Sequence, residues 1–188
     1  MMLWLTGDQP ADELLSSSPL ALLLGMVLDQ QVPLERAFKA PAELERRLGQ
    51  PLDAASIAAL DPEHLATVFA APPALHRFPS SMARRCHDVC AIVADQYGGD
   101  AAAIWMSASS GAELFRRMKA LPGFGDMKAK IFIALLGKQR GLEVPGWEEV
   151  SAPYSEPGAT RSIADITDQA SLEAVRAFKA SMKKKQAR

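Results

Sequence analysis

The stretch Leu121-Pro122-Gly123-Phe124-Gly125-Asp126 decides the fold of this chain. It joins two segments with the spacing of amphipathic helices, residues 111–120 and 127–136. Pro122 fixes φ and discourages continuation of the first helix. Gly123 and Gly125 permit backbone angles and close approaches that a Cβ would block. The second helix therefore begins with unpaired N–H groups beside a glycine-rich bend, which favours binding of an anion such as phosphate.

Basic residues gather around this bend, although the whole chain has a formal charge of −1. Only Glu113 and Asp126 oppose them locally. The basic residues in this region are Arg116, Arg117, Lys119, Lys128, Lys130, Lys138 and Arg140. The sequence thus predicts a local positive patch that would attract a nucleic-acid backbone.

The composition indicates a helical protein. A chain of 188 residues that is 48% hydrophobic suits one compact domain or two small lobes with a common core. Ala and Leu are frequent and β-branched runs are scarce, so we expect mostly helix. Residues 1–16 predict a short extended piece and a turn. Further helices are predicted over 20–28, 34–48, 51–60, 62–69, 82–97 and 163–185.

Neither a membrane span nor a metal site is expected. Residues 20–28 are apolar but too short to cross a bilayer, so we expect a cytoplasmic protein. Cys86 and Cys90 lie on one helix face, and a pair alone cannot complete a tetrahedral metal site. We expect them to be small buried side chains. The basic end, residues 182–188, suits a solvated terminus or an additional unspecific attraction for phosphate.

The pattern Leu-Pro-Gly-x-Gly-x-x-x-Ala, from Leu121 to Ala129, resembles the helix-hairpin-helix of the HhH-GPD superfamily of base-excision DNA glycosylases. Residues 24–32, with Gln30 and Gln31, are similar to a helix and turn of its alkylpurine-glycosylase branch. Residues 77–85 and 97–100 follow in the order that the superfamily has. The resemblance implies an all-α fold of two helical lobes with a cleft between them. The whole chain, 1–188, would form one unit, with lobes at 30–130 and at 1–29 plus 131–188.

The resemblance also implies partners and cofactors. The partner would be damaged double-stranded DNA, bound by a monomer that associates with the bacterial nucleoid. A monovalent cation would bridge carbonyls at 121–126. The iron–sulfur cluster of some relatives is not expected, because no cysteine follows Cys90. The residues expected to bind DNA are Gln30, Gln31, Gly123, Phe124, Gly125, Met127, Lys128 and Lys130.

A glycosylase needs a carboxylate near C1′, because breaking the N-glycosidic bond passes through an oxocarbenium-like state. The superfamily's aspartate position falls at 145–147, where no aspartate stands. The neighbouring Glu148 and Glu149 are therefore the candidate catalytic acids. Trp147 is a candidate for stacking on an everted base.

The lysine of lyase-type relatives would fall at Met127, one residue before Lys128. One residue turns a helical side chain by about 100°, so lyase activity is not expected. The preferred hypothesis is a monofunctional DNA N-glycosylase. The alternatives are a non-catalytic module that recognises bent or damaged DNA, and a helical protein-interaction domain.

Overall fold

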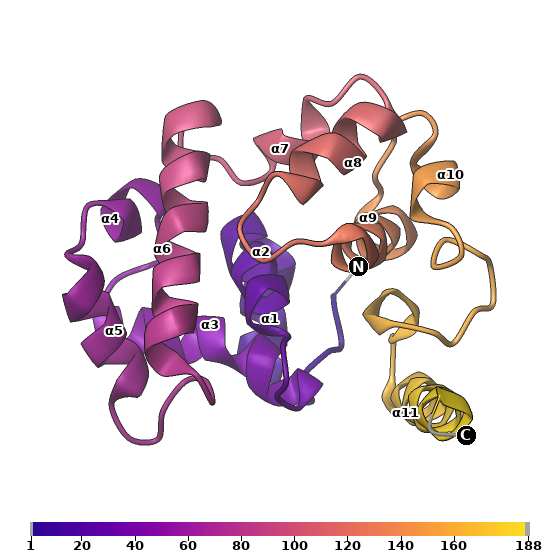
Figure 1. Cartoon of the computed structure of the whole chain (residues 1–188), viewed down its shortest axis with the longest axis horizontal. Coiled ribbons are helices and arrows are strands. Elements are labelled where there is room, and N and C mark those ends of the chain that lie inside the picture. The colour runs from indigo at the N-terminus through magenta and orange to yellow at the C-terminus, as the bar shows by residue number, and fades with distance from the viewer. Residues whose placement is uncertain (1, 187–188) are drawn as a thin grey trace.

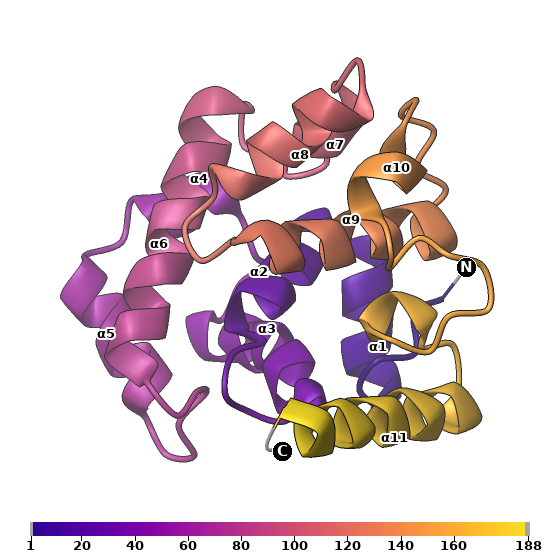
Figure 2. The same ribbon diagram turned by 45° about the vertical axis from the view of Figure 1, so that its right-hand side comes forward.

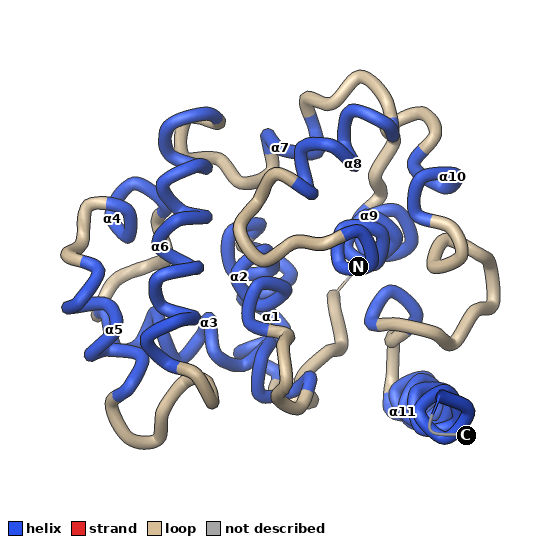
Figure 3. The backbone as a smooth tube through the Cα atoms, viewed as in Figure 1, coloured by secondary structure: helices blue, strands red, loops and turns tan. Residues whose placement is uncertain are grey.

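The computed structural model describes residues 2–186, and every regular element within that range is helical (Figures 1 and 3). The predicted all-α fold is therefore confirmed. The elements are α1 (Gln9–Ser17), α2 (Pro19–Leu28), α3 (Leu34–Leu48), α4 (Ala54–Ala58), α5 (Pro62–Ala70), α6 (Pro79–Gln96), α7 (Ala103–Met106), α8 (Gly111–Lys119), α9 (Asp126–Arg140), α10 (Trp147–Ser151), the 3₁₀ helix η1 (Ile163–Asp165) and α11 (Gln169–Gln186).

Helix α2 lies at the centre of the molecule (Figure 1). Every residue from Leu20 to Leu28 is buried, which explains why this helix is apolar on all sides. The Ser18 side chain accepts a hydrogen bond from the Ala21 N–H, so the helix begins with a capped first turn. A Cβ at Gly25 would lie 2.7 Å from the Phe38 ring, so α2 and α3 pack closely. This packing fixes the end of α2, from which the candidate site begins.

Helices α4 and α5 pack against α6 on the left of Figure 1. The inner face of α6 contains Cys86 and Cys90, both buried free thiols, as expected. Burial raises the pKa of the Cys90 thiol to about 12 and raises that of Cys86 as well, so both stay protonated at neutral pH. Within residues 2–186, no group of three or more His, Cys, Asp or Glu side chains could hold a metal ion.

Helix α9 packs against α8, α10 and η1. Phe132 of α9 makes edge-to-face contacts with Trp105 and Phe124, which anchor α7 and the residues before α9. A Cβ at Gly137 would lie 2.3 Å from the Trp147 ring, so α10 lies directly on α9. The two hairpin helices are thus supported by an aromatic core.

The structure corrects the prediction for the N-terminal segment. Residues 9–17 form α1 instead of continuing the predicted extended piece and turn. The Asp8 side chain accepts a hydrogen bond from the Ala11 N–H, and Pro10 stands in the first turn. This is a cap followed by proline, the signal that also starts α2 and α5.

The prediction of one helix over 163–185 is also wrong. The chain forms η1, leaves helical geometry at Ile166 and begins α11 at Gln169. The Asp165 carboxylate accepts hydrogen bonds from the N–H groups of Arg161 and Ser162, and Asp168 accepts one from Ser171. Two capping residues close together therefore start two separate helical segments.

Among the described residues, no single helix is both long and apolar enough to cross a membrane. Helices α1 and α2 reach that length and apolar character only as a pair, and the chain bends by 114° between them. The side chains of the basic tail, from residue 183 onward, lie outside the described part of the chain.

Candidate nucleic-acid interface

The turn between α8 and α9, residues 121–125, leaves main-chain donors free; we call it the hairpin turn. The first helical hydrogen bond of α9 runs from the Ala129 N–H to the Gly125 carbonyl. Within residues 2–186, the N–H groups of Met127 and Lys128 have no protein acceptor, and no side chain caps the helix. Lys119 pairs with Asp126 at 2.6 Å and offsets the acidic charge beside these amides. The start of α9 therefore offers donors to an anion.

Gly125 has no structural reason to be glycine. Its φ of −93° and ψ of 179° suit any residue, and a Cβ built there would meet nothing within 4 Å. The open space next to the free amides is therefore accessible to a bulky anion such as a phosphodiester.

Gln30 and Arg85 meet the hairpin turn, although they come from distant parts of the sequence. A Cβ at Gly123 would lie 2.5 Å from Arg85 Cδ and 3.4 Å from Gln30 Nε2. Arg85 donates a hydrogen bond to Gln30 Oε1 at 2.7 Å. The structure thus brings the predicted residues Gln30 and Gly123 together, with a cationic group that sequence reasoning did not select.

Replacing Gly123 by alanine is expected to lower the free energy of unfolding. Its φ of +87° costs a non-glycine residue about 1–3 kcal/mol, and the added Cβ would also displace Arg85. Gly49→Ala is the matched control, because Gly49 has a φ of +68° and no neighbour within 4 Å. Urea unfolding should show a larger loss for Gly123→Ala, and the excess should shrink in an Arg85→Ala background. Equal losses in both backgrounds would contradict the close packing of Arg85 on the turn.

His76 holds the segment around Gln30 in place. Its Nε2 lies 3.1 Å from the Leu28 carbonyl and 3.0 Å from the Gln30 carbonyl, and its Nδ1 accepts the Phe78 N–H. These contacts assign the neutral form with the proton on Nε2. Burial lowers the pKa of His76, which favours this form. Sequence analysis found no role for His76, because its partners lie more than forty residues away.

Gln31 is exposed and has a φ of +54°, the only positive φ among the described residues other than glycine. Such a conformation is uncommon for a residue with a side chain. It turns the chain between α2 and α3 beside the residues that contact Gly123.

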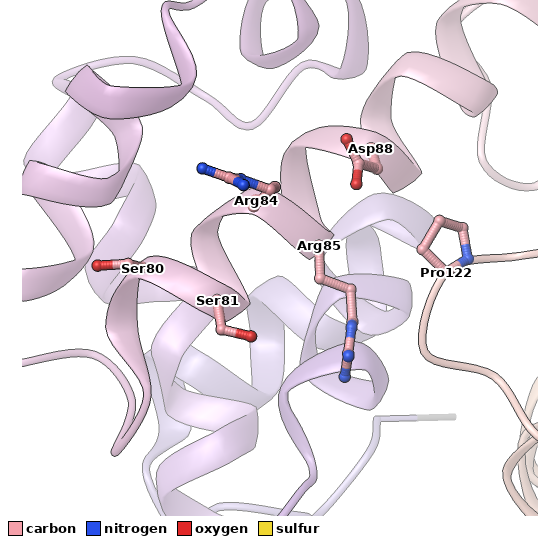
Figure 4. Close-up of a pocket in the computed structure, with 6 residues that line it drawn as sticks. All are labelled: Ser80, Ser81, Arg84, Arg85, Asp88 and Pro122. Carbon is pink, nitrogen blue, oxygen red and sulfur yellow. The ribbon is translucent and has the colours of Figure 1, made fainter.

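A pocket of about 410 Å³ lies between α6 and the hairpin turn. In Figure 4, Arg85 extends from α6 on the side of Pro122, whereas Arg84 points away from it. Ser80 and Ser81 line the same pocket from the first turn of α6. Arg85 and these hydroxyls, together with the Asp88 carboxylate, extend the polar surface from the hairpin turn along α6, and Arg85 gives it a group that can pair with a phosphate.

Lys128 and Lys130 anchor neighbouring elements. Lys128 Nζ donates to the carbonyls of Met26 at 2.7 Å, Val27 at 3.3 Å and Asp29 at 3.3 Å, so it closes the end of α2. Burial lowers the pKa of Lys128 to about 8. Lys130 donates to the Ala152 carbonyl at 3.1 Å. Both ammonium groups therefore have structural partners and also add positive charge behind the hairpin turn.

Lys128→Met is expected to destabilise the protein by about 1–3 kcal/mol, because the Met26 and Asp29 carbonyls lose the ammonium group that donates to them. Urea unfolding measures the change. Lys39→Met, which removes a half-exposed ion pair with Asp8, should change stability by less than about 1 kcal/mol. A Lys128 variant as stable as this control would contradict the anchoring role.

A second pocket, of about 400 Å³, opens between α2, α9 and α11; we call it the cleft pocket. Met127 and Lys128 line it from the first turn of α9, and Asp29 lines it from the end of α2. In Figure 2 the end of α11 lies on the same side of the molecule as the start of α9. The remaining lining residues are Met26, Ile131, Tyr154, Arg161, Phe178, Lys179 and Met182.

The residues predicted for catalysis lie elsewhere. Glu148 and Glu149 are exposed on α10, and Glu148 lines a different pocket with Lys138 and Trp147. Lys138 stands ten residues after Lys128 on α9, about 15 Å along the helix axis. Trp147 packs its ring on Gly137. The structure therefore does not bring these three residues to the hairpin turn or to the cleft pocket.

The comparison with known families agrees with this architecture. Residues 24–188 match the family described as HhH-GPD superfamily base excision DNA repair protein, a range that contains Gln30, the hairpin turn and the lining of the cleft pocket. No curated protein and no solved structure matches the chain. The repair domains of this family bind DNA. The chain therefore belongs to the HhH-GPD superfamily of base-excision DNA repair proteins.

Proposed function

We propose that the protein is a monofunctional DNA N-glycosylase that acts on damaged double-stranded DNA. One observation carries the proposal: the free amides of Met127 and Lys128 stand in the same helical turn that lines the cleft pocket. A phosphate bound to these amides would place the adjoining nucleotide at the mouth of the cleft pocket. A volume of about 400 Å³ is in the range of small-molecule sites.

Gln30 and Gln31 would occupy the gap that an everted nucleotide leaves in the duplex. Gln30 is held by Arg85 and by the Val27 carbonyl, so its position is fixed before DNA binds. Gln31 is exposed and can offer an amide to the unpaired opposite base. Lys130, with Arg85, would add attraction for phosphate.

The hairpin turn also suits a monovalent cation. The Leu121 carbonyl accepts the Phe124 N–H, while within residues 2–186 the carbonyls of Gly123 and Phe124 accept no hydrogen bond. Uncharged carbonyl oxygens are ligands for hard cations. We expect duplex affinity to fall when a bulky organic cation replaces K⁺ or Na⁺ at constant ionic strength, because the bulky cation cannot enter the turn.

A base-release assay tests the proposal. The full chain is incubated with duplexes that each carry one alkylated, deaminated or oxidised base, and abasic sites are then cleaved by alkali. We expect abasic product from at least one lesion and no adduct trapped by borohydride, because Lys128 Nζ is held by carbonyls. Tight binding without abasic product across the panel would contradict glycosylase activity.

That outcome would favour the second candidate, a module that recognises damaged DNA without cleaving it. Pro145, Gly146 and Trp147 stand where the superfamily has its aspartate, which is the observation that favours this candidate.

A further inference from the structure

We propose that Asp29 is the catalytic carboxylate and that the cleft pocket receives the everted nucleotide. This inference rests on the glycosylase function proposed above. It assigns a residue to which the sequence patterns gave no role.

Asp29 is held firmly by its main chain and has a free side chain. It follows the last residue of α2, its N–H donates to the Gly25 carbonyl at 3.0 Å, and its own carbonyl accepts Lys128 Nζ. Among the side chains that the structure describes, those of residues 2–182, none forms a hydrogen bond or an ion pair of 4 Å or less with the Asp29 carboxylate. Asp29 is partly buried and lines both the cleft pocket and a neighbouring pocket of about 310 Å³. Partial burial of a carboxylate that accepts no hydrogen bond from a described side chain costs folding free energy, which is typical of groups kept for function.

The lining of the cleft pocket suits a nucleobase. Its apolar wall comes from three different helices and includes Met26, Ile131 and Phe178. Tyr154, Arg161 and Lys179 add polar groups, and Arg161 also pairs with Glu156 at 3.0 Å. Apolar faces with a few polar groups are the usual environment of a bound base.

Asp29 and the hairpin turn border the pocket together. Met127, which is 65% exposed, carries one of the free amides and also lines the cleft pocket. A strand gripped at the start of α9 therefore presents its sugar on the side where Asp29 lies. Glu148 does not meet this condition, because it lines a pocket near the other end of α9.

The electrostatic surroundings suit a carboxylate that acts on a developing positive charge. Burial raises the pKa of Asp29, while the ammonium groups of Lys179 and Lys128 oppose this rise. A carboxylate that is partly removed from water stabilises a nearby oxocarbenium ion more strongly than it would in solution.

The reaction is a hydrolysis. The bond between C1′ and the base nitrogen breaks, and the base leaves with the bonding electron pair and takes up a proton from solvent. The carboxylate of Asp29 stabilises the positive charge that develops on C1′ and the ring oxygen. A water oxygen then bonds to C1′, and the proton it loses passes to Asp29, which later returns it to solvent.

The test uses the lesion that the wild-type chain releases best and measures single-turnover base release. We expect Asp29→Asn to slow release by about 100-fold or more, the scale of losing one electrostatic group at a reacting centre. Duplex affinity should change by less than threefold. Asp95→Asn, at an exposed position on α6, is the matched control and should keep the wild-type rate.

The outcomes separate the two proposals. If the wild type releases a base and Asp29→Asn releases it at the same rate, this inference alone is overturned. If Glu148→Gln or Glu149→Gln loses base release while Asp29→Asn keeps it, the catalytic carboxylate lies on α10 instead. Absence of release by the wild type on every lesion would overturn the glycosylase proposal, and this inference with it. A melting temperature of Asp29→Asn at or above that of the wild type shows that lost activity is not lost folding.

Discussion

Replacing Gly125 by serine is expected to weaken duplex binding by roughly 10- to 100-fold while leaving the fold at least as stable as in the wild type. Serine is favoured at the residue before a helix, where its hydroxyl accepts the N–H groups of the first turn. In this chain those donors are the amides of Met127 and Lys128, which have no protein acceptor within residues 2–186. The new hydroxyl would therefore compete with a phosphate. The expected loss corresponds to one charge-assisted hydrogen bond of about 1.5–3 kcal/mol.

Stability and binding should thus change in opposite directions. The new side chain enters open space, since a Cβ at Gly125 has no neighbour within 4 Å. Fluorescence anisotropy with a labelled duplex measures affinity, and urea unfolding measures stability. Gly49→Ser, at the end of α3, should leave affinity unchanged. Unchanged affinity of the Gly125 variant would show that these amides do not contact the backbone of DNA.

The sequence predicts those parts of the interface that are local in the chain. The hairpin turn is encoded by Pro122 and Gly123, which are adjacent, and the Gln-Gln segment follows directly on an apolar helix. Local patterns of this kind are set by backbone geometry and capping, which a single sequence displays.

The residues that sequence analysis missed act through long-range contacts. Arg85 meets Gln30 across 55 positions of the sequence, and His76 binds the Leu28 carbonyl across 48. Lys128 was predicted as a DNA-binding residue, but its bonds to the end of α2 span about a hundred positions. Neither periodicity nor spacing indicates such pairs.

The choice of carboxylate illustrates the same limit. Counting along the sequence from the hairpin turn leads to Glu148 and Glu149. The count assumes that the chain returns to the cleft directly after α9, as the resemblance to the superfamily implies. Here the Pro145 carbonyl instead accepts the N–H of Gly111 at the start of α8, and Trp147 packs on Gly137. Glu148 and Glu149 belong to α10 and therefore lie near the start of α8 and the end of α9. Asp29 reaches the cleft pocket from the other side, on a helix that lies a hundred residues earlier.

The end of α2 connects these observations. Its carbonyls are held by Lys128 from α9, by the amide of Gln30 and by His76 from the segment before α6. Three parts of the chain thus fix one turn of backbone, from which Asp29 and Gln30 project. The main chain that carries Asp29 therefore needs little reorganisation when a nucleotide enters, which favours electrostatic catalysis.

Asp29 is finally expected to give opposite pH dependences for activity and stability. Only the ionised carboxylate can stabilise the oxocarbenium ion, so base release should fall tenfold per pH unit below the pKa of Asp29, which burial raises above its ordinary value of 3.8. Asp29→Asn should lose this acidic limb of the rate profile. Other charged or titratable groups surround Asp29, and both proteins in the comparison, the wild type and Asp29→Asn, contain them. These groups are Glu35, Lys128, Tyr154, Arg161, Arg176 and Lys179.

For stability the sign is reversed. Because the pKa of Asp29 is higher in the folded than in the unfolded chain, the folded state binds more protons in the interval between the two values. Ionisation therefore costs stability as the pH rises through that interval. The difference in unfolding free energy between Asp29→Asn and the wild type should be smallest below pH 3.8 and should grow in favour of the variant up to neutral pH. Urea unfolding at a series of pH values, with Asp95→Asn as the control, measures this difference. A difference that stays constant with pH would mean that the carboxylate is solvated as in the unfolded chain, and Asp29 would then lack the buried setting on which its proposed role depends.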